Sequence, residues 1–117
     1  MLRLGILGST KGTDLEAIIS AINNGSISAK INLVLSNKEN AIILERAKRH
    51  NLKAEYLSDN LISRDQYATL LTKRFLDNNV NLILLIGFMK ILANSFCKDW
   101  QDRIINVHPS LLPKYSG

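Results

Sequence analysis

The fold of this chain is decided by residues 2–16, Leu-Arg-Leu-Gly-Ile-Leu-Gly-Ser-Thr-Lys-Gly-Thr-Asp-Leu-Glu. The run from Leu2 to Leu7 is nearly all apolar, which is typical of a β-strand covered on both faces. Two glycines in residues 8–12 interrupt this run. Thr13 followed by Glu16 is a capping-box pattern, which predicts that a helix begins there. Apolar residues at i, i+3, i+4 and i+7 from Leu15 give this helix one buried face.

The same alternation of strand and helix continues along the chain. Ser63 and Gln66 form a second capping-box pattern at the start of a third helix. The periodicity predicts further strands at 31–36, 53–58, 81–86 and 103–107, and further helices at 41–50 and 91–100. Because parallel strands need crossover connections, the alternation predicts an α/β fold, with a mostly parallel twisted sheet and helices on both faces. The weakly apolar strand at 53–58 is expected near a sheet edge.

Length and composition favour one globular domain over residues 1–117, with 46% hydrophobic and 21% charged residues. The longest apolar run, Leu82–Met89, is far shorter than the roughly 20 residues that a membrane-spanning helix needs, so no membrane partner is expected. The single cysteine, Cys97, excludes an internal disulfide and a cysteine-cluster zinc site. We interpret it as a small buried hydrophobe, and we expect a cytoplasmic protein.

The charge of the chain is basic, with 15 Lys and Arg against 10 Asp and Glu and a formal net charge of +5. This balance favours anionic ligands such as phosphates and carboxylates. The densest basic cluster spans residues 46–50, where we place a helix C-terminus that cations would stabilise. We therefore interpret the cluster as structural and expect no nucleic-acid partner.

Ligands of open parallel sheets bind beyond the carboxyl ends of the strands, which directs attention to the loops 8–13, 87–90 and 106–110. The first loop matches neither the dinucleotide fingerprint nor a Walker A sequence. It nevertheless joins a strand to a helix through Gly8 and Gly12, which suits an anion at the helix N-terminus. An ordinary strand-to-helix turn explains the same residues, and both interpretations stay open.

The last loop carries an Asn and a His separated by one residue. Asn106 and His108 would point the same way from an extended chain. An amide can donate to a developing oxyanion and an imidazole can transfer a proton near neutral pH, so the pair suits acyl-type transfer. A structural, hydrogen-bonded histidine is the alternative at this stage.

Longer matches point to one family. Residues 106–113, Asn-Val-His-Pro-Ser-Leu-Leu-Pro, resemble the active-site motif of the phosphoribosylglycinamide formyltransferases. Residues 87–92, Gly-Phe-Met-Lys-Ile-Leu, are similar to another segment of that family, as are residues 36–38, 44–47 and 63–64. The resemblance covers the whole chain and implies a Rossmann-like fold. It also implies transfer of a formyl group from 10-formyltetrahydrofolate to the amine of glycinamide ribonucleotide, in purine synthesis.

The resemblance also implies roles for individual residues, without a metal ion. The ribonucleotide phosphate would be held by Gly12, Thr13 and Asp14. The folate would be held by Arg64, Met89, Lys90, Ile91, Leu92 and Asn106. Asn106 and His108 would be catalytic. Asp14 stands where many members have Asn. Lys90 stands where Arg is common, so the positive charge is kept there but the planar guanidinium is lost.

The family's chains are longer and end with further strands, a long helix and an Asp that pairs with the catalytic His. Residues 1–117 are therefore expected to be a truncated, N-terminal nucleotide-binding portion that is inactive or nearly so. The strand at 103–107 would lack a neighbour, which favours a homodimer or other association through the open sheet edge.

Two alternatives remain at this point. The methionyl-tRNA formyltransferases share Asn-x-His and Ser-Leu-Leu-Pro, although their first loop differs and an Arg-Gly normally follows. A non-catalytic module that binds the ribonucleotide phosphate is the alternative of a different class.

Overall fold

The computed structural model describes residues 1–107, which form a five-stranded sheet with helices on both faces. The elements follow one another as β1 (Leu2–Gly8), α1 (Thr13–Asn23), β2 (Ala29–Ser36), α2 (Ile42–Arg49), β3 (Ala54–Tyr56), α3 (Arg64–Asp77), β4 (Leu82–Ile86), α4 (Asn94–Asp99) and β5 (Ile104–Val107). Every strand pair is parallel, in the order β3-β2-β1-β4-β5. The predicted α/β fold is therefore confirmed.

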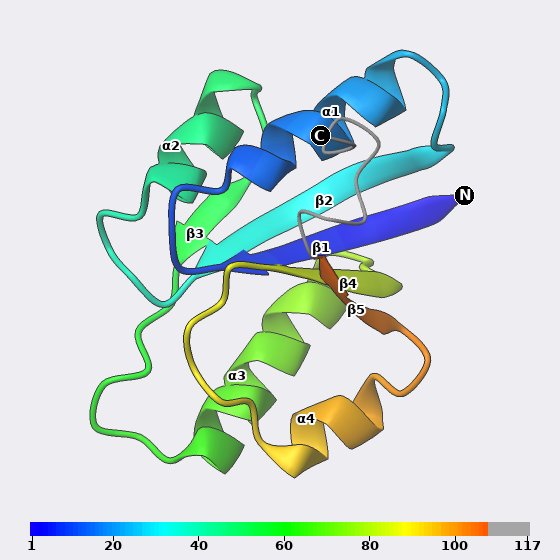
Figure 1. Ribbon diagram of the computed structural model, residues 1–117. Helices are drawn as coiled ribbons and strands as arrows, with labels where there is room; N and C mark the ends of the chain where they lie inside the picture. The colour runs from blue at the N-terminus through cyan, green and yellow to red at the C-terminus, as the bar shows by residue number, and fades with distance from the viewer. Residues whose placement is uncertain (108–117) are drawn as a thin grey trace.

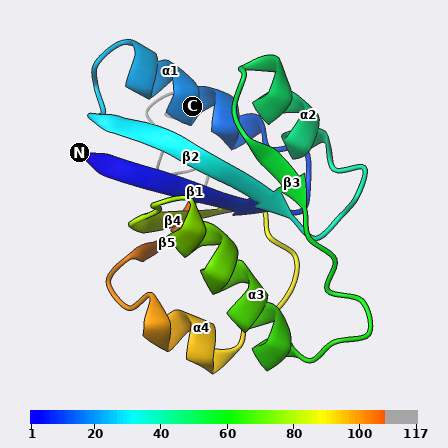
Figure 2. The ribbon, with the colours of Figure 1, turned by 180° about the vertical axis from the view of Figure 1, so that it is seen from behind.

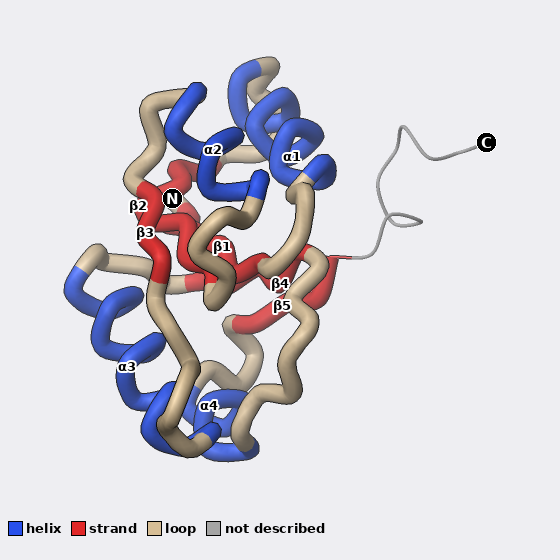
Figure 3. Tube along the Cα trace, turned by 90° about the vertical axis from the view of Figure 1, so that its left-hand side faces the viewer, coloured by secondary structure: helices blue, strands red, loops and turns tan. Residues whose placement is uncertain are grey.

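The helices divide into two layers, with α1 and α2 on one face of the sheet and α3 and α4 on the other (Figures 1 and 3). Side chains of β1 supply both layers because successive residues of a strand point to opposite faces. Leu4 and Ile6 pack in the core beneath α1 and α2. Leu7 packs with Phe75 and Trp100 in the core beneath α3 and α4.

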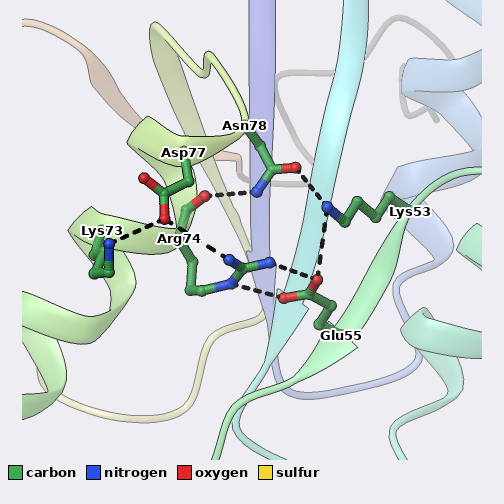
Figure 4. A network of polar contacts seen from close by, with 6 residues as sticks. All are labelled: Lys53, Glu55, Lys73, Arg74, Asp77 and Asn78. Atoms are coloured by element: carbon green, nitrogen blue, oxygen red, sulfur yellow. Dashed lines mark hydrogen bonds and ion pairs between the residues drawn. The ribbon is translucent and has the colours of Figure 1, made fainter.

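The predicted edge strand is short, and polar contacts with α3 add to the packing of Ala54 against the core. β3 pairs only with β2 among the described strands, and it lies at the sheet edge (Figure 2). Arg74 of α3 donates two hydrogen bonds to the Glu55 carboxylate of β3, at 3.0 and 2.7 Å. Lys53 Nζ donates to Asn78 Oδ1 at 2.9 Å (Figure 4). These contacts attach the edge strand to the C-terminal end of α3.

The fourth helix differs from its prediction in two respects. It begins at Asn94 instead of residue 91, since Ala93 is its extended N-cap residue. Cys97 is exposed, so its interpretation as a buried hydrophobe is wrong. Phe96 and Trp100, one helical turn apart, occupy the inward positions and leave Cys97 outside.

The basic cluster at residues 46–50 lies in the last turn of α2 and at its C-cap, as predicted. No helix among residues 1–107 is long and apolar enough to cross a membrane. The same part of the chain contains no group of three or more His, Cys, Asp or Glu side chains that could hold a metal ion.

Candidate functional site

The loops that follow β1, β2 and β4 meet at one edge of the sheet, on the left of Figure 1. The Ser9 N–H donates to the Gly87 carbonyl at 3.3 Å, and the Met89 N–H donates to Ser9 Oγ at 3.1 Å. Ser9 Oγ donates in turn to Asn37 Oδ1 at 2.8 Å. Gly87 has φ of 58°, and a Cβ there would lie 2.5 Å from Thr10 Oγ1. The positive φ and the approach of Thr10 therefore favour glycine where these loops meet.

The start of α1 differs from its sequence prediction. Gly12 is the N-cap residue, in the left-handed conformation with φ 67° and ψ 32°, and no side chain among the described residues caps the helix. Thr13 is already the first helical residue, so the predicted Thr13–Glu16 capping box is wrong. The Glu16 carboxylate instead contacts Arg46 and His50 of the neighbouring helix segment.

Backbone donors remain available at this helix start. Within residues 1–107, the N–H groups of Lys11, Gly12 and Thr13 donate no hydrogen bond. Unpaired N–H groups at a helix N-terminus carry a partial positive charge and can bind an anion. Asp14 is buried, with 8% of its surface exposed. The geometry therefore favours anion binding through the backbone.

The glycines of this loop also have a packing role. A Cβ on Gly12 would collide with the side chain of Ile43 in α2, and a Cβ on Gly8 would lie 2.6 Å from the Ile86 carbonyl oxygen. Glycine at these positions is thus required by close contacts within the fold, as well as being suited to a ligand. A hollow of about 530 Å³ adjoins the loop and is lined by residues that include Lys11 and Lys38.

A second pocket, of about 390 Å³, lies between the start of α3 and the segment that leads into α4. Five of the residues predicted to contact folate line it, namely Arg64, Met89, Lys90, Ile91 and Leu92. Met89 and Ile91 are each 71% exposed, which is unusual for large apolar side chains. The pocket therefore combines apolar walls with two cationic side chains.

The start of α3 is well defined. Ser63 Oγ accepts the Gln66 N–H at 3.0 Å, and Gln66 Oε1 accepts the Ser63 N–H at 2.8 Å. This reciprocal capping box confirms the sequence prediction and makes Arg64 the first helical residue. Ser95 Oγ donates to the Asp65 carboxylate at 3.0 Å and links α3 to α4. Arg64 is therefore carried by a rigid helix end.

The pocket is also lined by residues that the sequence analysis did not assign to the folate, among them Asp59, Tyr67 and Phe88. The Asp59 carboxylate lies 3.5 Å from Lys90 Nζ. The Tyr67 hydroxyl donates to the Leu57 carbonyl at 2.7 Å. Burial, and then the charge of Asp59, raises the pKa of Tyr67 above its ordinary range, so the phenol stays protonated. Tyr67 was assigned only to the apolar face of its helix, while Asp59 lies in a loop without a motif.

Of the two residues expected to be catalytic, the structure describes only Asn106. Asn106 is exposed near the end of β5 and is paired in register with Leu85 of β4. It therefore emerges at a carboxyl end, as predicted, although it does not line the pocket that contains Arg64. His108 lies outside the described residues.

Comparison with known proteins identifies the family. The model of the formyl transferase family matches residues 2–117, so the chain belongs to that family. A phosphoribosylglycinamide formyltransferase of Haemophilus influenzae is 40% identical over the whole chain, which spans 56% of that relative. The trifunctional purine biosynthetic protein adenosine-3 of Drosophila pseudoobscura pseudoobscura is 41% identical over 98% of the chain, which spans 9% of that protein.

Solved structures agree with this assignment. The glycinamide ribonucleotide transformylase 1 of Symbiobacterium toebii superposes with a TM-score of 0.88 at 34% identity, covering all of this chain and 56% of its own. The phosphoribosylglycinamide formyltransferase of Coxiella burnetii gives a TM-score of 0.86 at 38% identity, covering 99% of this chain and 55% of its own. The chain thus spans about half the length of these single-enzyme relatives.

Proposed function

We propose that this chain is the N-terminal part of a phosphoribosylglycinamide formyltransferase. Such an enzyme transfers the formyl group of 10-formyltetrahydrofolate to the amine of glycinamide ribonucleotide. The observation that carries the proposal is the pocket lined by Arg64 and residues 89–92. Met89 of this pocket donates its N–H to Ser9 of the first loop, so the two regions adjoin. Two ligand sites that lie together at the carboxyl ends of the strands suit a reaction between two substrates.

The ribonucleotide phosphate binds at the start of α1, to Gly12, Thr13 and Asp14. The available N–H groups of Gly12 and Thr13, together with the positive end of the helix dipole, stabilise its charge. Because Asp14 carries a carboxylate, its contribution comes from the backbone. Lys11 offsets the negative charge of that side chain.

The folate binds in the pocket beside α3. Its volume, about 390 Å³, lies within the usual range of small-molecule sites. The flat pterin packs against the apolar side chains of Met89, Ile91 and Leu92. Arg64 and Lys90 attract the carboxylates at the other end of a folate, and the Asp59 carboxylate holds Lys90 beside the pocket.

The chemistry is attack of the neutral amine on the formyl carbon. A new C–N bond forms, and the carbonyl oxygen becomes an oxyanion that the Asn106 amide stabilises by hydrogen bonding. The tetrahedral intermediate collapses as the bond from carbon to the folate nitrogen breaks. His108, as an imidazolium, helps to stabilise the oxyanion and takes part in moving the amine's proton to that nitrogen. No covalent enzyme intermediate is needed.

The test measures binding and transfer separately. Calorimetric titration with glycinamide ribonucleotide, with and without the folate, is followed by an assay for the formylated product. Because residues 1–117 alone are expected to be nearly inactive, transfer is measured in the complete enzyme that contains them. There we expect Asn106→Ala to lower transfer by about 10²–10³-fold while ribonucleotide binding is retained. Asn60→Ala, on an exposed loop, is the matched control. Ribonucleotide binding without any transfer by the complete enzyme would favour the non-catalytic module, and binding of neither substrate would contradict both functions.

A cytoplasmic setting and self-association belong to the same proposal. β5 pairs only with β4 among the described strands, and its Ile105 is 48% exposed. An apolar strand edge of this kind can pair with a second copy. Sedimentation of the 117-residue chain at increasing concentration tests this, and a monomer throughout would contradict it.

A further inference from the structure

Arg46 of α2 reaches across to the loop that precedes α1. Its Nε donates to the Lys11 carbonyl oxygen at 2.7 Å, and its Nη1 donates to Glu16 Oε2 at 3.2 Å. The side chain is 22% exposed. One guanidinium therefore contacts both the last loop residue before the Gly12 N-cap and the first turn of the helix.

The contact with the Lys11 carbonyl determines the direction of the next N–H. In a planar trans peptide, the C=O of one residue and the N–H of the following residue point in opposite directions. Because the Lys11 carbonyl is held toward Arg46, the Gly12 N–H is directed away from the guanidinium. The Ile43 N–H donates to the Thr10 carbonyl at 3.2 Å and orients the Lys11 N–H in the same manner.

Gly12 needs such an external restraint. Glycine has more backbone freedom than any other residue, and here it adopts φ 67° at a helix start that no side chain of residues 1–107 caps. Without a contact on the preceding carbonyl, the peptide could rotate and turn its N–H away from a bound anion. Arg46 supplies that contact with a charged, and therefore strong, hydrogen-bond donor.

Glu16 holds Arg46 in place. Its carboxylate accepts from Arg46 and also lies 2.8 Å from His50 Nε2. Partial burial raises the pKa of Glu16, but hydrogen bonds and charges from His50 and Arg46 outweigh burial and leave the pKa below its ordinary value of 4.5. Glu16 is therefore ionised at neutral pH and anchors the guanidinium against α1.

We propose that Arg46 is a positioning residue for the ribonucleotide phosphate, which acts by orienting the Gly12 N–H without touching the ligand. This inference rests on the proposed function, because it assumes that the phosphate binds at the start of α1. It assigns a role in substrate binding to a residue of the basic cluster that the sequence indicated to be structural.

The test compares three variants of the 117-residue chain by calorimetric titration with glycinamide ribonucleotide. We expect Arg46→Gln to weaken binding about tenfold, as for loss of a charged hydrogen bond. Arg46→Lys, which retains the charge, should restore part of the affinity. Arg49→Gln is the matched control, because Arg49 lies in the same turn and its side chain makes no hydrogen bond or ion pair with the described residues. Folate affinity should stay unchanged in all three.

The outcomes separate this inference from the proposed function. If the unchanged chain binds the ribonucleotide and Arg46→Gln binds it as well as Arg49→Gln does, the inference is wrong and the proposed function stands. If the unchanged chain does not bind the ribonucleotide, both are wrong. The amide NMR signal of Gly12 in the free protein adds a measurement without ligand. It should shift in Arg46→Gln but not in Arg49→Gln, and an unshifted signal would also overturn the inference.

Discussion

The starts of α1 and α3 carry the same sequence pattern, but they are built differently. Ser63 and Gln66 complete a reciprocal capping box at α3. Thr13 and Glu16 do not, because Gly12 is the N-cap and Glu16 contacts Arg46 and His50. A helix start that caps itself pairs its own N–H groups, whereas among residues 1–107 no partner pairs with the N–H groups of Gly12 and Thr13 at the start of α1. The comparison shows that one sequence pattern can give two different helix starts, of which the uncapped one is where we propose that the phosphate binds.

Gly12→Ala should have the largest effect on this difference. A Cβ there collides with Ile43, and φ is positive. We expect a loss of about 2–4 kcal/mol in the free energy of unfolding, measured by urea denaturation, from overpacking and an unfavourable backbone conformation. Gly25→Ala is the control, because Gly25 also has positive φ but nothing lies within 4 Å of its Cβ position. It should lose about 1 kcal/mol. Equal losses would show that packing on Ile43 is unimportant.

Removing the hydroxyl groups at the two helix starts tests the caps directly. Ser63→Ala should lower the free energy of unfolding by about 1 kcal/mol, because it removes an N-cap hydrogen bond. Thr13→Ala should change it by only a few tenths of a kcal/mol, because the Thr13 side chain caps nothing. Urea denaturation of both variants makes the measurement. A larger loss for Thr13→Ala than for Ser63→Ala would contradict the assignment of the two caps.

The smallest effect concerns pH. The pKa of Glu16 is lower in the folded chain than its ordinary value of 4.5, so its contribution to stability is present above that value. The contribution is lost as the pH falls through the lowered pKa. Because the pair is partly exposed, we expect less than about 1 kcal/mol. Urea denaturation at pH 6 and pH 3 should show that the free energy of unfolding falls more at pH 3 in the unchanged chain than in Glu16→Gln. Equal falls in the two proteins would contradict this contribution of Glu16.

Local patterns predicted most of the fold. The apolar stripe of α1, the capping box at Ser63 and the weak strand predicted at 53–58 all depend on neighbours along the chain, which a sequence displays directly. The strand itself is shorter, Ala54–Tyr56. The delayed start of α4 and the exposure of Cys97 were not predicted. There the inward positions are taken by Phe96 and Trp100, and which face of a short helix is buried depends on what packs against it.

The candidate site was predicted in part. The resemblance named Arg64 and residues 89–92, and all five line one pocket. Asp59 was missed because it belongs to a loop without periodicity. It is far from Lys90 in the sequence, and only the tertiary structure brings the two side chains together. Arg46 was assigned to the end of its helix, since its contact with Lys11 spans 35 residues of sequence.

The sequence by itself determined the order of strands and helices, their parallel arrangement and the family, because these follow from periodicity, crossover connections and motifs that are local in the chain. Only the tertiary structure decided which capping pattern forms a cap, which glycines are required by close contacts, and which side chains hold the first loop. These outcomes depend on the competition between near and distant partners for the same polar groups. Glu16 illustrates this, because contacts with Arg46 and His50 engage a carboxylate that the local pattern assigned to the backbone of its own helix.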